Sequence, residues 1–169
     1  MTTIFAVDAA TIKSGYAFLR MEDNKITIED FGWVKAKGTM GERLNQLRST
    51  IRDRVQEYQP DFVAVEDLKF NRGTPNLSSM TKVAFAIGNV YTAFEEAGHK
   101  EIISLTANVV RKVWDVKQAK EPLRRAVNKK FLEQLVDKGR PDGFTKSDQD
   151  IVDAVGLAVA AWVKEINNE

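Results

Sequence analysis

The chain has 169 residues, 43% of them hydrophobic, which is enough apolar material for one compact domain with a buried core. Its 25 basic and 24 acidic residues leave a net charge of +1, so overall charge identifies no partner. There is no cysteine, which excludes disulfides, thiolate zinc sites and cysteine nucleophiles. We therefore expect a single domain over residues 1–169, and any nucleic-acid signal has to come from local clusters of charge.

Two further features bear on the compartment. The N-terminal residues lack the basic segment and the longer apolar run of a signal peptide. No apolar stretch approaches the roughly 20 residues that a membrane-spanning helix needs. Together with the absence of cysteine, these features predict a cytoplasmic protein, in a bacterial or an infected host cell, with no membrane partner.

The first half of the chain predicts a sheet that includes a hairpin. Two short apolar runs, typical of buried strands, end in the carboxylates Asp8 and Glu66. A short polar link at 22–24 favours a hairpin between two further strands. The predicted elements are strands at 4–8, 14–21 and 25–34, a helix at 39–58 and a strand at 62–66.

The second half of the chain predicts mostly helices. Thr106 is placed to cap a short helix, and Pro122 suits a first helical turn. Ser147, three residues before Asp150, predicts a capping-box-like start to the last helix. The predicted elements are a helix at 77–97, a strand at 102–105, and helices at 106–114, 122–137 and 147–166. Three strands followed by alternating helices and strands indicate a mixed sheet covered by helices.

Four acidic residues lie where a site would form. Asp8 and Glu66 end their strands, and strand ends open onto the crevice where α/β proteins usually place ligands. Asp150 and Asp153, three residues apart in one helix, lie on nearly the same face. Divalent cations make such crowding of carboxylates tolerable, and oxygen ligands suit Mg²⁺ or Mn²⁺. Two such metals can activate a water and stabilise the leaving oxygen in phosphodiester hydrolysis.

Each acid taken alone also has an ordinary structural interpretation. An Asp after a strand is usually a turn former or a helix cap, and Asp150 and Asp153 alone could complement a helix dipole. For Asp153 the apolar residues that follow at 154–159 favour a buried face, where an acid has a desolvation cost to explain.

The same segments resemble a known family. Residues 4–8 followed by Ser14-Gly15-Tyr16-Ala17 resemble the opening of the RuvC-type Holliday junction resolvases. Pro60-Asp61-Phe62-Val63-Ala64-Val65-Glu66 is similar to the second acidic segment of that family, and the residues at 150–158 resemble its closing Asp-x-x-Asp helix. The motifs span nearly the whole chain in the same order, which makes the resemblance far more specific than any single motif.

The resemblance implies an RNase H-like fold, a five-stranded mixed sheet with three antiparallel strands and then two parallel ones, flanked by helices. It implies that Asp8, Glu66, Asp150 and Asp153 are the catalytic ligands of two Mg²⁺ or Mn²⁺ ions per active site. It also implies a homodimer that makes paired incisions across a four-way DNA junction and leaves 5′-phosphate and 3′-hydroxyl ends.

The chain departs from the family in three places. Ala9-Ala10 stands where the family has Pro-Gly, so this turn must avoid the positive φ that glycine permits. Asp67 adds an acid beside Glu66, without a role that the sequence assigns. Phe70, Asn71 and Arg72 stand where the family has a junction-probing loop, and we predict that they contact DNA. We interpret this divergence as typical of a virus- or phage-encoded relative.

Basic residues cluster between 111 and 130, where eight of them stand against two acids. Such a stretch suits phosphate binding, although helical lysines and arginines are commonly only a solvated face. The resemblance favours Arg111 and Lys120 as phosphate contacts. The residues that we predict to bind DNA here are Arg111, Lys117, Lys120 and Arg124.

The helix predicted at 77–97 is apolar on too many sides for a surface helix. Part of it must pack on the sheet, and the resemblance predicts that the remainder forms a dimer interface. Val90 and Phe94 are the positions that the sequence offers for testing that interface.

Other functions compete with a junction resolvase. An actin-like ATPase or sugar-kinase domain also opens with a strand and an Asp, but such proteins need two domains and a second Gly-rich phosphate loop. A catalytically inactive junction-binding module would be expected to have lost an acid, whereas all four are present. A nuclease with broader specificity for flaps, forks and three-way junctions stays open.

Overall fold

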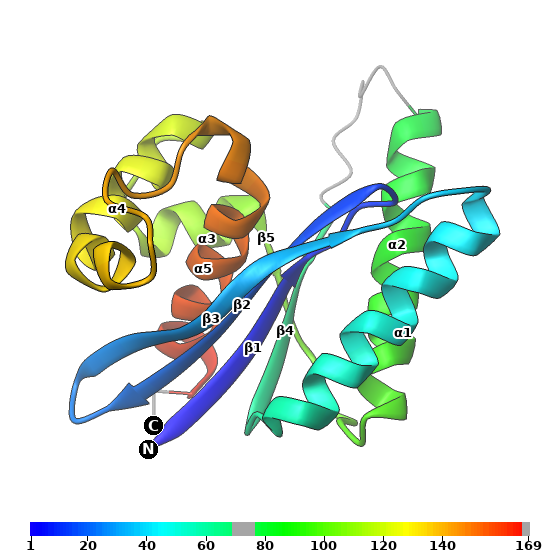
Figure 1. Cartoon of the computed structure of the whole chain (residues 1–169), viewed down its shortest axis with the longest axis horizontal. Helices are drawn as coiled ribbons and strands as arrows, with labels where there is room; N and C mark the ends of the chain where they lie inside the picture. Colours follow the sequence, from blue (N-terminus) through cyan, green and yellow to red (C-terminus); the bar gives the residue numbers. More distant parts are fainter. Residues whose placement is uncertain (69–76, 167–169) are drawn as a thin grey trace.

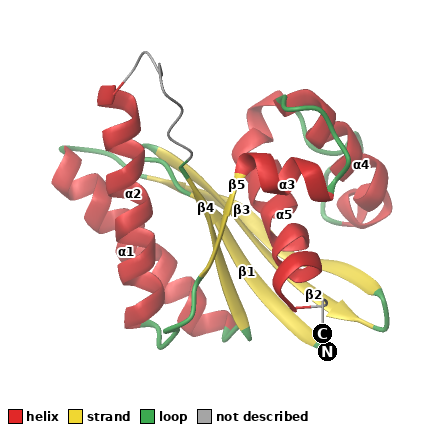
Figure 2. Ribbon diagram, turned by 180° about the vertical axis from the view of Figure 1, so that it is seen from behind, coloured by secondary structure: helices red, strands yellow, loops and turns green. Residues whose placement is uncertain are grey.

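A five-stranded mixed sheet separates two layers of helices in the computed structural model, which describes residues 1–68 and 77–166 (Figures 1 and 2). The strands are β1 (Thr2–Asp8), β2 (Lys13–Glu22), β3 (Lys25–Lys35), β4 (Phe62–Asp67) and β5 (Ile103–Thr106). The helices are α1 (Met40–Tyr58), α2 (Leu77–Glu96), α3 (Ala107–Val113), α4 (Lys120–Asp137) and α5 (Gln149–Ala161). A 3₁₀ turn, η1 (Lys146–Asp148), precedes α5, and a π-helical turn, η2 (Trp162–Ile166), follows it.

The strand order is β3-β2-β1-β4-β5, with β1, β2 and β3 antiparallel and with β4 and β5 parallel to β1. This arrangement confirms the predicted sheet of three antiparallel and two parallel strands. The hairpin between β2 and β3 turns at Asp23 and Asn24, whose φ angles of 48° and 63° suit a two-residue turn of type I′.

Alternate side chains of β1 pack into two separate hydrophobic cores, because successive residues of a strand point to opposite faces of the sheet. Phe5 and Val7 pack with the layer formed by α1 and α2. Ile4 and Ala6 pack with the layer of α3, α4 and α5. Helix α5 lies between the sheet and α4 in Figure 1 and is buried along its length, apart from Asp150 near its start. Asp153 is the one charged side chain buried on this helix.

The start of the last helix differs from the prediction. The predicted capping box of Ser147 and Asp150 is wrong, because the reciprocal hydrogen bonds are made by Thr145, which precedes η1, and Asp148, the last residue of η1. The α-helical part ends at Ala161, and the remainder to Ile166 is the π-helical turn.

Two smaller points concern the other helices. Thr106 does occupy the N-cap position of α3, but its side chain makes no capping hydrogen bond. None of the helices among the described residues is long and apolar enough to cross a membrane.

Candidate active site

Asp8 and Glu66 end two neighbouring parallel strands. Val7 of β1 is paired with Val65 of β4, so the two acids are the next residues on strands that run in the same direction. Both carboxylates consequently lie at the same edge of the sheet, as the sequence predicted.

Gly15 brings the start of α5 to this edge. It is the direct partner of Asp8 on β2, and a Cβ atom placed on it would lie 2.0 Å from the carbonyl oxygen of Asp150 and 2.6 Å from the backbone nitrogen of Ile151. Contacts this short are impossible for a real side chain, so only glycine lets the helix backbone rest on the strand. The helix that carries Asp150 and Asp153 is thereby placed beside Asp8.

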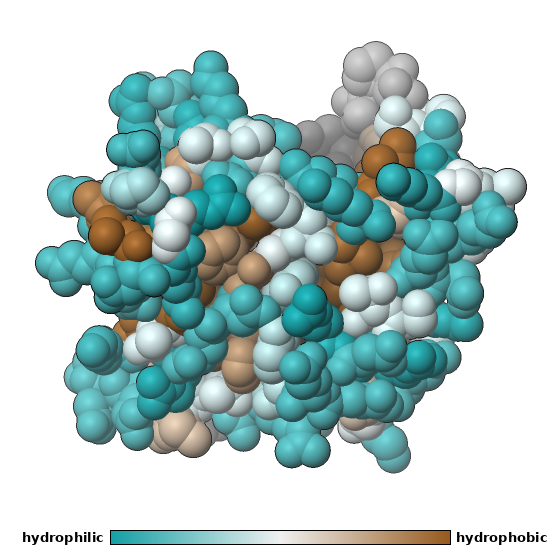
Figure 3. All heavy atoms as spheres, in the orientation of Figure 1, coloured by the Kyte–Doolittle hydropathy of each residue, from teal (hydrophilic) through white to brown (hydrophobic). Residues whose placement is uncertain are grey.

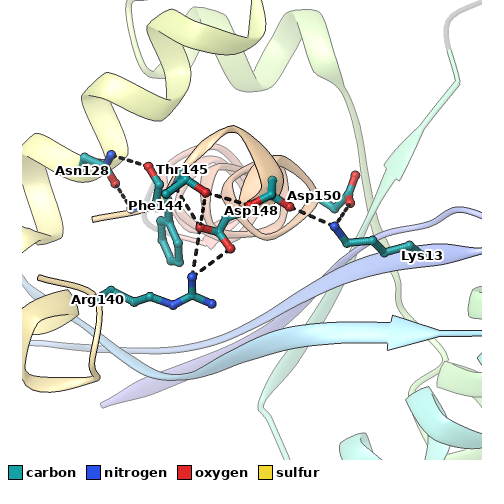
Figure 4. Close-up of polar contacts among 8 residues, drawn as sticks. Lys13, Asn128, Arg140, Phe144, Thr145, Asp148 and Asp150 are labelled. Carbon is teal, nitrogen blue, oxygen red and sulfur yellow. Dashed lines mark hydrogen bonds and ion pairs between the residues drawn. The ribbon is translucent and has the colours of Figure 1, made fainter. Parts of the chain in front are cut away.

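Lys13 holds the same helix start from the side of β2, as Figure 4 shows. Its Nζ donates a hydrogen bond to the carbonyl oxygen of Ser147 at 2.9 Å and lies 3.7 Å from a carboxylate oxygen of Asp150. The ammonium group therefore sits at the rim of the acidic cluster. The sequence analysis did not single out this residue, because no local pattern around it predicts a contact 134 residues away along the chain.

Asp153 is fixed by two polar neighbours in a buried position. Only 6% of it is exposed. The Gln149 amide donates to its carboxylate at 3.0 Å, and a terminal nitrogen of Arg111 lies 3.7 Å from the same oxygen. Arg124 in turn donates to the Gln149 side chain at 3.4 Å. Sequence reasoning missed Gln149, although a polar residue one turn before a buried acid is the available signal for such a contact.

Burial and mutual repulsion perturb the acids of the cluster. Burial, and after it the charges of Glu66, Asp153 and Asp150, raise the pKa of Asp8 well above its usual value. Burial and the charge of Asp153 raise the pKa of Glu66 to about 7, against the lowering effect of Arg111 and Lys120. The pKa of Asp153 is also raised by burial, while Gln149, Arg111 and Lys120 oppose the rise. The charges of Glu66, Asp153 and Asp150 all act on Asp8, so the four acids lie within electrostatic range of one site.

The donor set fits a hard divalent cation. All four candidate ligands are carboxylates, and a cation among them would relieve the repulsion that raises their pKa values. In the described part of the chain, no three acidic or histidine side chains stand in a ready-made metal-holding arrangement. In this structure the carboxylate of Asp153 is paired with Gln149 and Arg111, and that of Asp150 with Lys13.

A buried acid anchors the segment that leads into α5. Asp148 is 0% exposed and accepts hydrogen bonds from the backbone of Thr145 at 2.8 Å and from the guanidinium of Arg140 at 3.0 and 3.1 Å (Figure 4). Asn128 of α4 holds the adjoining backbone by exchanging two hydrogen bonds with Phe144. This network fixes the direction in which α5 enters the site.

The predicted DNA-binding residues differ in how far they are exposed. Lys117 and Lys120 are exposed, and Lys120 is close enough to the acids to lower the pKa of Asp8, Glu66 and Asp153. Arg124 is half-buried and lines a pocket of about 310 Å³ with Lys120 and Gln149.

Arg111 has a different environment from the other basic residues. It is 7% exposed, and its guanidinium donates to the carbonyl oxygens of Ala119 and Ala107 at 3.1 and 3.4 Å while facing Asp153. Its side chain thus points into the acidic cluster. Phe70, Asn71 and Arg72 lie outside the described residues.

The two other departures from the family pattern are also explained. Ala9 and Ala10 have no positive φ, and the Ser14 hydroxyl closes their turn by donating to the Ala10 carbonyl at 2.8 Å and accepting from the Ala10 N–H at 2.9 Å. Asp67 is exposed and accepts a hydrogen bond from the backbone of Leu68 at 2.8 Å, which helps to end β4.

A sheet of this topology with acids at the ends of β1 and β4 and on α5 defines a nuclease of the RNase H-like class. The family model for the crossover junction endodeoxyribonuclease RuvC matches residues 4–161. The RuvC of Alkaliphilus metalliredigens is 30% identical over 164 residues, which cover 92% of this chain and 90% of that protein. The chain belongs to the RuvC family of crossover junction endodeoxyribonucleases, which are metal-dependent enzymes.

Solved structures agree with this fold. The Thermus thermophilus RuvC in complex with a Holliday junction substrate superposes with a TM-score of 0.75 at 19% identity, covering 94% of this chain and 91% of that one. The fowlpox virus resolvase in its complex with Holliday junction DNA gives a TM-score of 0.56 at 19% identity, covering 94% and 95%.

Proposed function

We propose that residues 1–169 form one nuclease domain that resolves four-way DNA junctions by hydrolysing phosphodiester bonds. The observation that carries this proposal is the convergence of Asp8, Glu66, Asp150 and Asp153 at one edge of the sheet in a chain of the RuvC family. The bacterial relatives and the absence of cysteine support cytoplasmic action on DNA.

In this proposal Asp8, Glu66, Asp150 and Asp153 hold two Mg²⁺ or Mn²⁺ ions. Ions bound there would lower the pKa of a bound water, so that it can attack the phosphate as hydroxide. They would also stabilise the negative charge on the leaving 3′ oxygen. Gln149 keeps the Asp153 carboxylate turned toward the cluster, and Arg111 balances its charge. The leaving group departs with a 3′-hydroxyl, so the products keep ligatable 5′-phosphates.

The basic residues around α4 would bind the DNA backbone. The side of the site formed by α3 and α4 carries Lys117, Lys120 and Arg124. Their side chains are exposed or half-buried there, so they can contact DNA phosphates from the surface. Phe70, Asn71 and Arg72, which follow β4 directly in sequence, stay our candidates for contacts at the branch point.

We further propose a homodimer that uses α2. Ile87 and Phe94 pack into the core beneath the helix, whereas Phe85 is 52% exposed and has the exposed small residues Ala84 and Gly88 beside it on the helix surface. An exposed aromatic flanked by small side chains suits close packing of two copies of this helix about a two-fold axis. On the face drawn in Figure 3, hydrophobic colour forms separate areas among hydrophilic side chains.

Two alternatives remain distinct from junction resolution. A nuclease with broad specificity would cut flaps, forks and three-way junctions as well, and an inactive module would bind junctions without cutting. The intact carboxylate cluster favours an active enzyme, and the solved complexes of the Thermus and fowlpox proteins with Holliday junctions favour four-way DNA.

The test is a cleavage assay on labelled four-way, three-way, flap and linear DNA in Mg²⁺. The proposal predicts efficient nicking of the four-way junction and loss of at least 100-fold in rate for Asp8→Asn, Glu66→Gln, Asp150→Asn and Asp153→Asn. Junction binding in Ca²⁺ should survive these four changes. Asp67→Asn is the matched control and should keep its activity, because Asp67 turns to the Leu68 backbone. Cutting that persists in EDTA would contradict the metal-dependent mechanism.

A further inference from the structure

Two lysines face each other at the end of the β2–β3 pair. Lys13 and Lys35 are direct partners in the antiparallel register, and both extend over the indole ring of Trp33. Their Nζ atoms lie 4.6 and 5.0 Å from the ring centroid. Like charges placed directly opposite each other destabilise a sheet, so the stability of the isolated fold does not explain this pair.

The acids nearby do not balance this charge. The Arg140 guanidinium, 5.7 Å from the Trp33 ring, is already paired with the buried Asp148. Lys13 has Asp150 at 3.7 Å. Within residues 1–68 and 77–166, no acidic group lies within 4.0 Å of the Lys35 ammonium, and this lysine is exposed. A surplus of positive charge therefore lies next to the carboxylate cluster on the side of β2 and β3.

This surplus lies on the opposite side of α5 from the basic residues of α4. Lys13 reaches the start of α5 from the sheet, whereas Arg124 reaches the same turn from α4 through Gln149. Figure 1 shows α5 between the sheet and α4. The acids of the helix start are thus flanked by cations on both sides.

We propose that Lys13 and Lys35, held over Trp33, form a second binding surface for the sugar-phosphate backbone of DNA. The inference rests on the proposed nuclease function and adds to it that the bound strand is held on both sides of the carboxylates. The indole ring orders both ammonium groups by cation–π attraction, which lowers the cost of fixing two flexible side chains. Phosphates would also relieve the repulsion between the two lysines, and such contacts supply much of the salt-dependent affinity for DNA.

The experiment measures the affinity of the full-length protein for a four-way junction in Ca²⁺ over a series of KCl concentrations. The slope of log affinity against log salt is negative, and Lys35→Gln should make it less steep by about one unit, as Lys120→Ala should. Lys35→Arg should keep the wild-type slope. Lys25→Gln is the matched control, because this exposed lysine lies at the far end of the same strand and should change nothing.

Thermal unfolding separates binding from folding. Because Lys35→Gln removes both the repulsion from Lys13 and an exposed cation–π contact of similar size, its unfolding midpoint should stay close to that of the wild type. A wild-type slope for Lys35→Gln, or a less steep slope that comes with a large fall in the unfolding midpoint, would overturn the inference.

The outcome is distinguishable from a failure of the proposed function. If the wild type cuts junctions but Lys35→Gln keeps the full slope, only this binding surface is wrong. If the wild type cuts no branched DNA and Lys35→Gln still lowers the slope on junction and linear duplex alike, the surface stands and junction resolution is wrong.

Discussion

Gly15 is the residue on which the assembly of the four acids depends most directly. Gly15→Ala would drive a methyl group into the Asp150 carbonyl, so we expect the start of α5 to shift and cleavage to fall at least 100-fold. Unfolding should become easier by about 2 kcal/mol, since overpacking a tight contact typically costs 1–3 kcal/mol. Gly41→Ala on α1, whose added methyl would meet nothing within 4 Å, is the control and should leave both quantities near wild type. Equal behaviour of the two variants in cleavage and thermal unfolding would contradict this role.

The raised pKa of Glu66 predicts a particular dependence of stability on pH. The folded carboxyl titrates near 7 and an unfolded one near 4.5, so between these values the folded protein binds more protons. The stabilisation of the folded state that this residue contributes is therefore lost as the pH rises from about 4.5 through about 7.

Thermal unfolding of the wild type and of Glu66→Gln in EDTA checks this sign. We expect the variant to gain stability relative to the wild type between about pH 5 and pH 8. Adding Mg²⁺ should stabilise the wild type more at the higher pH, where the carboxylates are ionised and repel each other most. A gap between the two proteins that is independent of pH would show that Glu66 is not perturbed.

The elements themselves follow well from local sequence, but their contacts across the fold do not. Strand β1 and the hairpin are visible in the apolar runs and the Asp23-Asn24 turn, since these depend on neighbours in the chain. The burial of Arg111 is not visible, because a run of basic residues does not reveal which guanidinium will find the carbonyls of Ala107 and Ala119.

The beginning of α5 and the outward face of α2 also depend on contacts across the fold that local sequence does not predict. The sequence predicted the wrong capping residues for α5, because the deciding partner of Asp148 is Arg140, which approaches from the preceding loop. It offered Val90 and Phe94 for an interface, whereas both are 0% exposed in the core. Helical periodicity marks an apolar helix but cannot say which of its apolar sides faces outward when several do.

The α5 start supplies an element-scale prediction. Asp148→Ala leaves Arg140 without its partner and removes the Thr145 cap, and breaking a buried pair of this kind costs roughly 3–5 kcal/mol. We expect the midpoint of thermal unfolding to fall by roughly 6–20 °C. Asp142→Ala, an exposed acid in the same loop, should stay within 1–2 °C of wild type, at roughly the size of a surface substitution. A small shift for Asp148→Ala would mean that the network does not anchor the helix.

At the scale of the whole molecule, the dimer is tested on the exposed side of α2. Phe85→Glu should give a folded monomer by sedimentation and circular dichroism, because the side chain is half-exposed and its loss leaves the core intact. Leu132→Glu on α4, similarly exposed, is the control and should remain a dimer. A wild type that is monomeric at micromolar concentration, or a Phe85→Glu dimer, would contradict the proposed interface.

Junction resolution by paired cuts is the central claim, and a supercoiled plasmid with an extruded cruciform tests it most directly. Two coordinated nicks within one binding event convert the plasmid to a linear product, whereas independent nicks accumulate as open circles. We predict that the wild type in Mg²⁺ yields linear plasmid with ligatable ends from the outset and that Glu66→Gln yields none. Accumulation of open circles before any linear product, or equal cutting of a plasmid without the cruciform, would contradict the account.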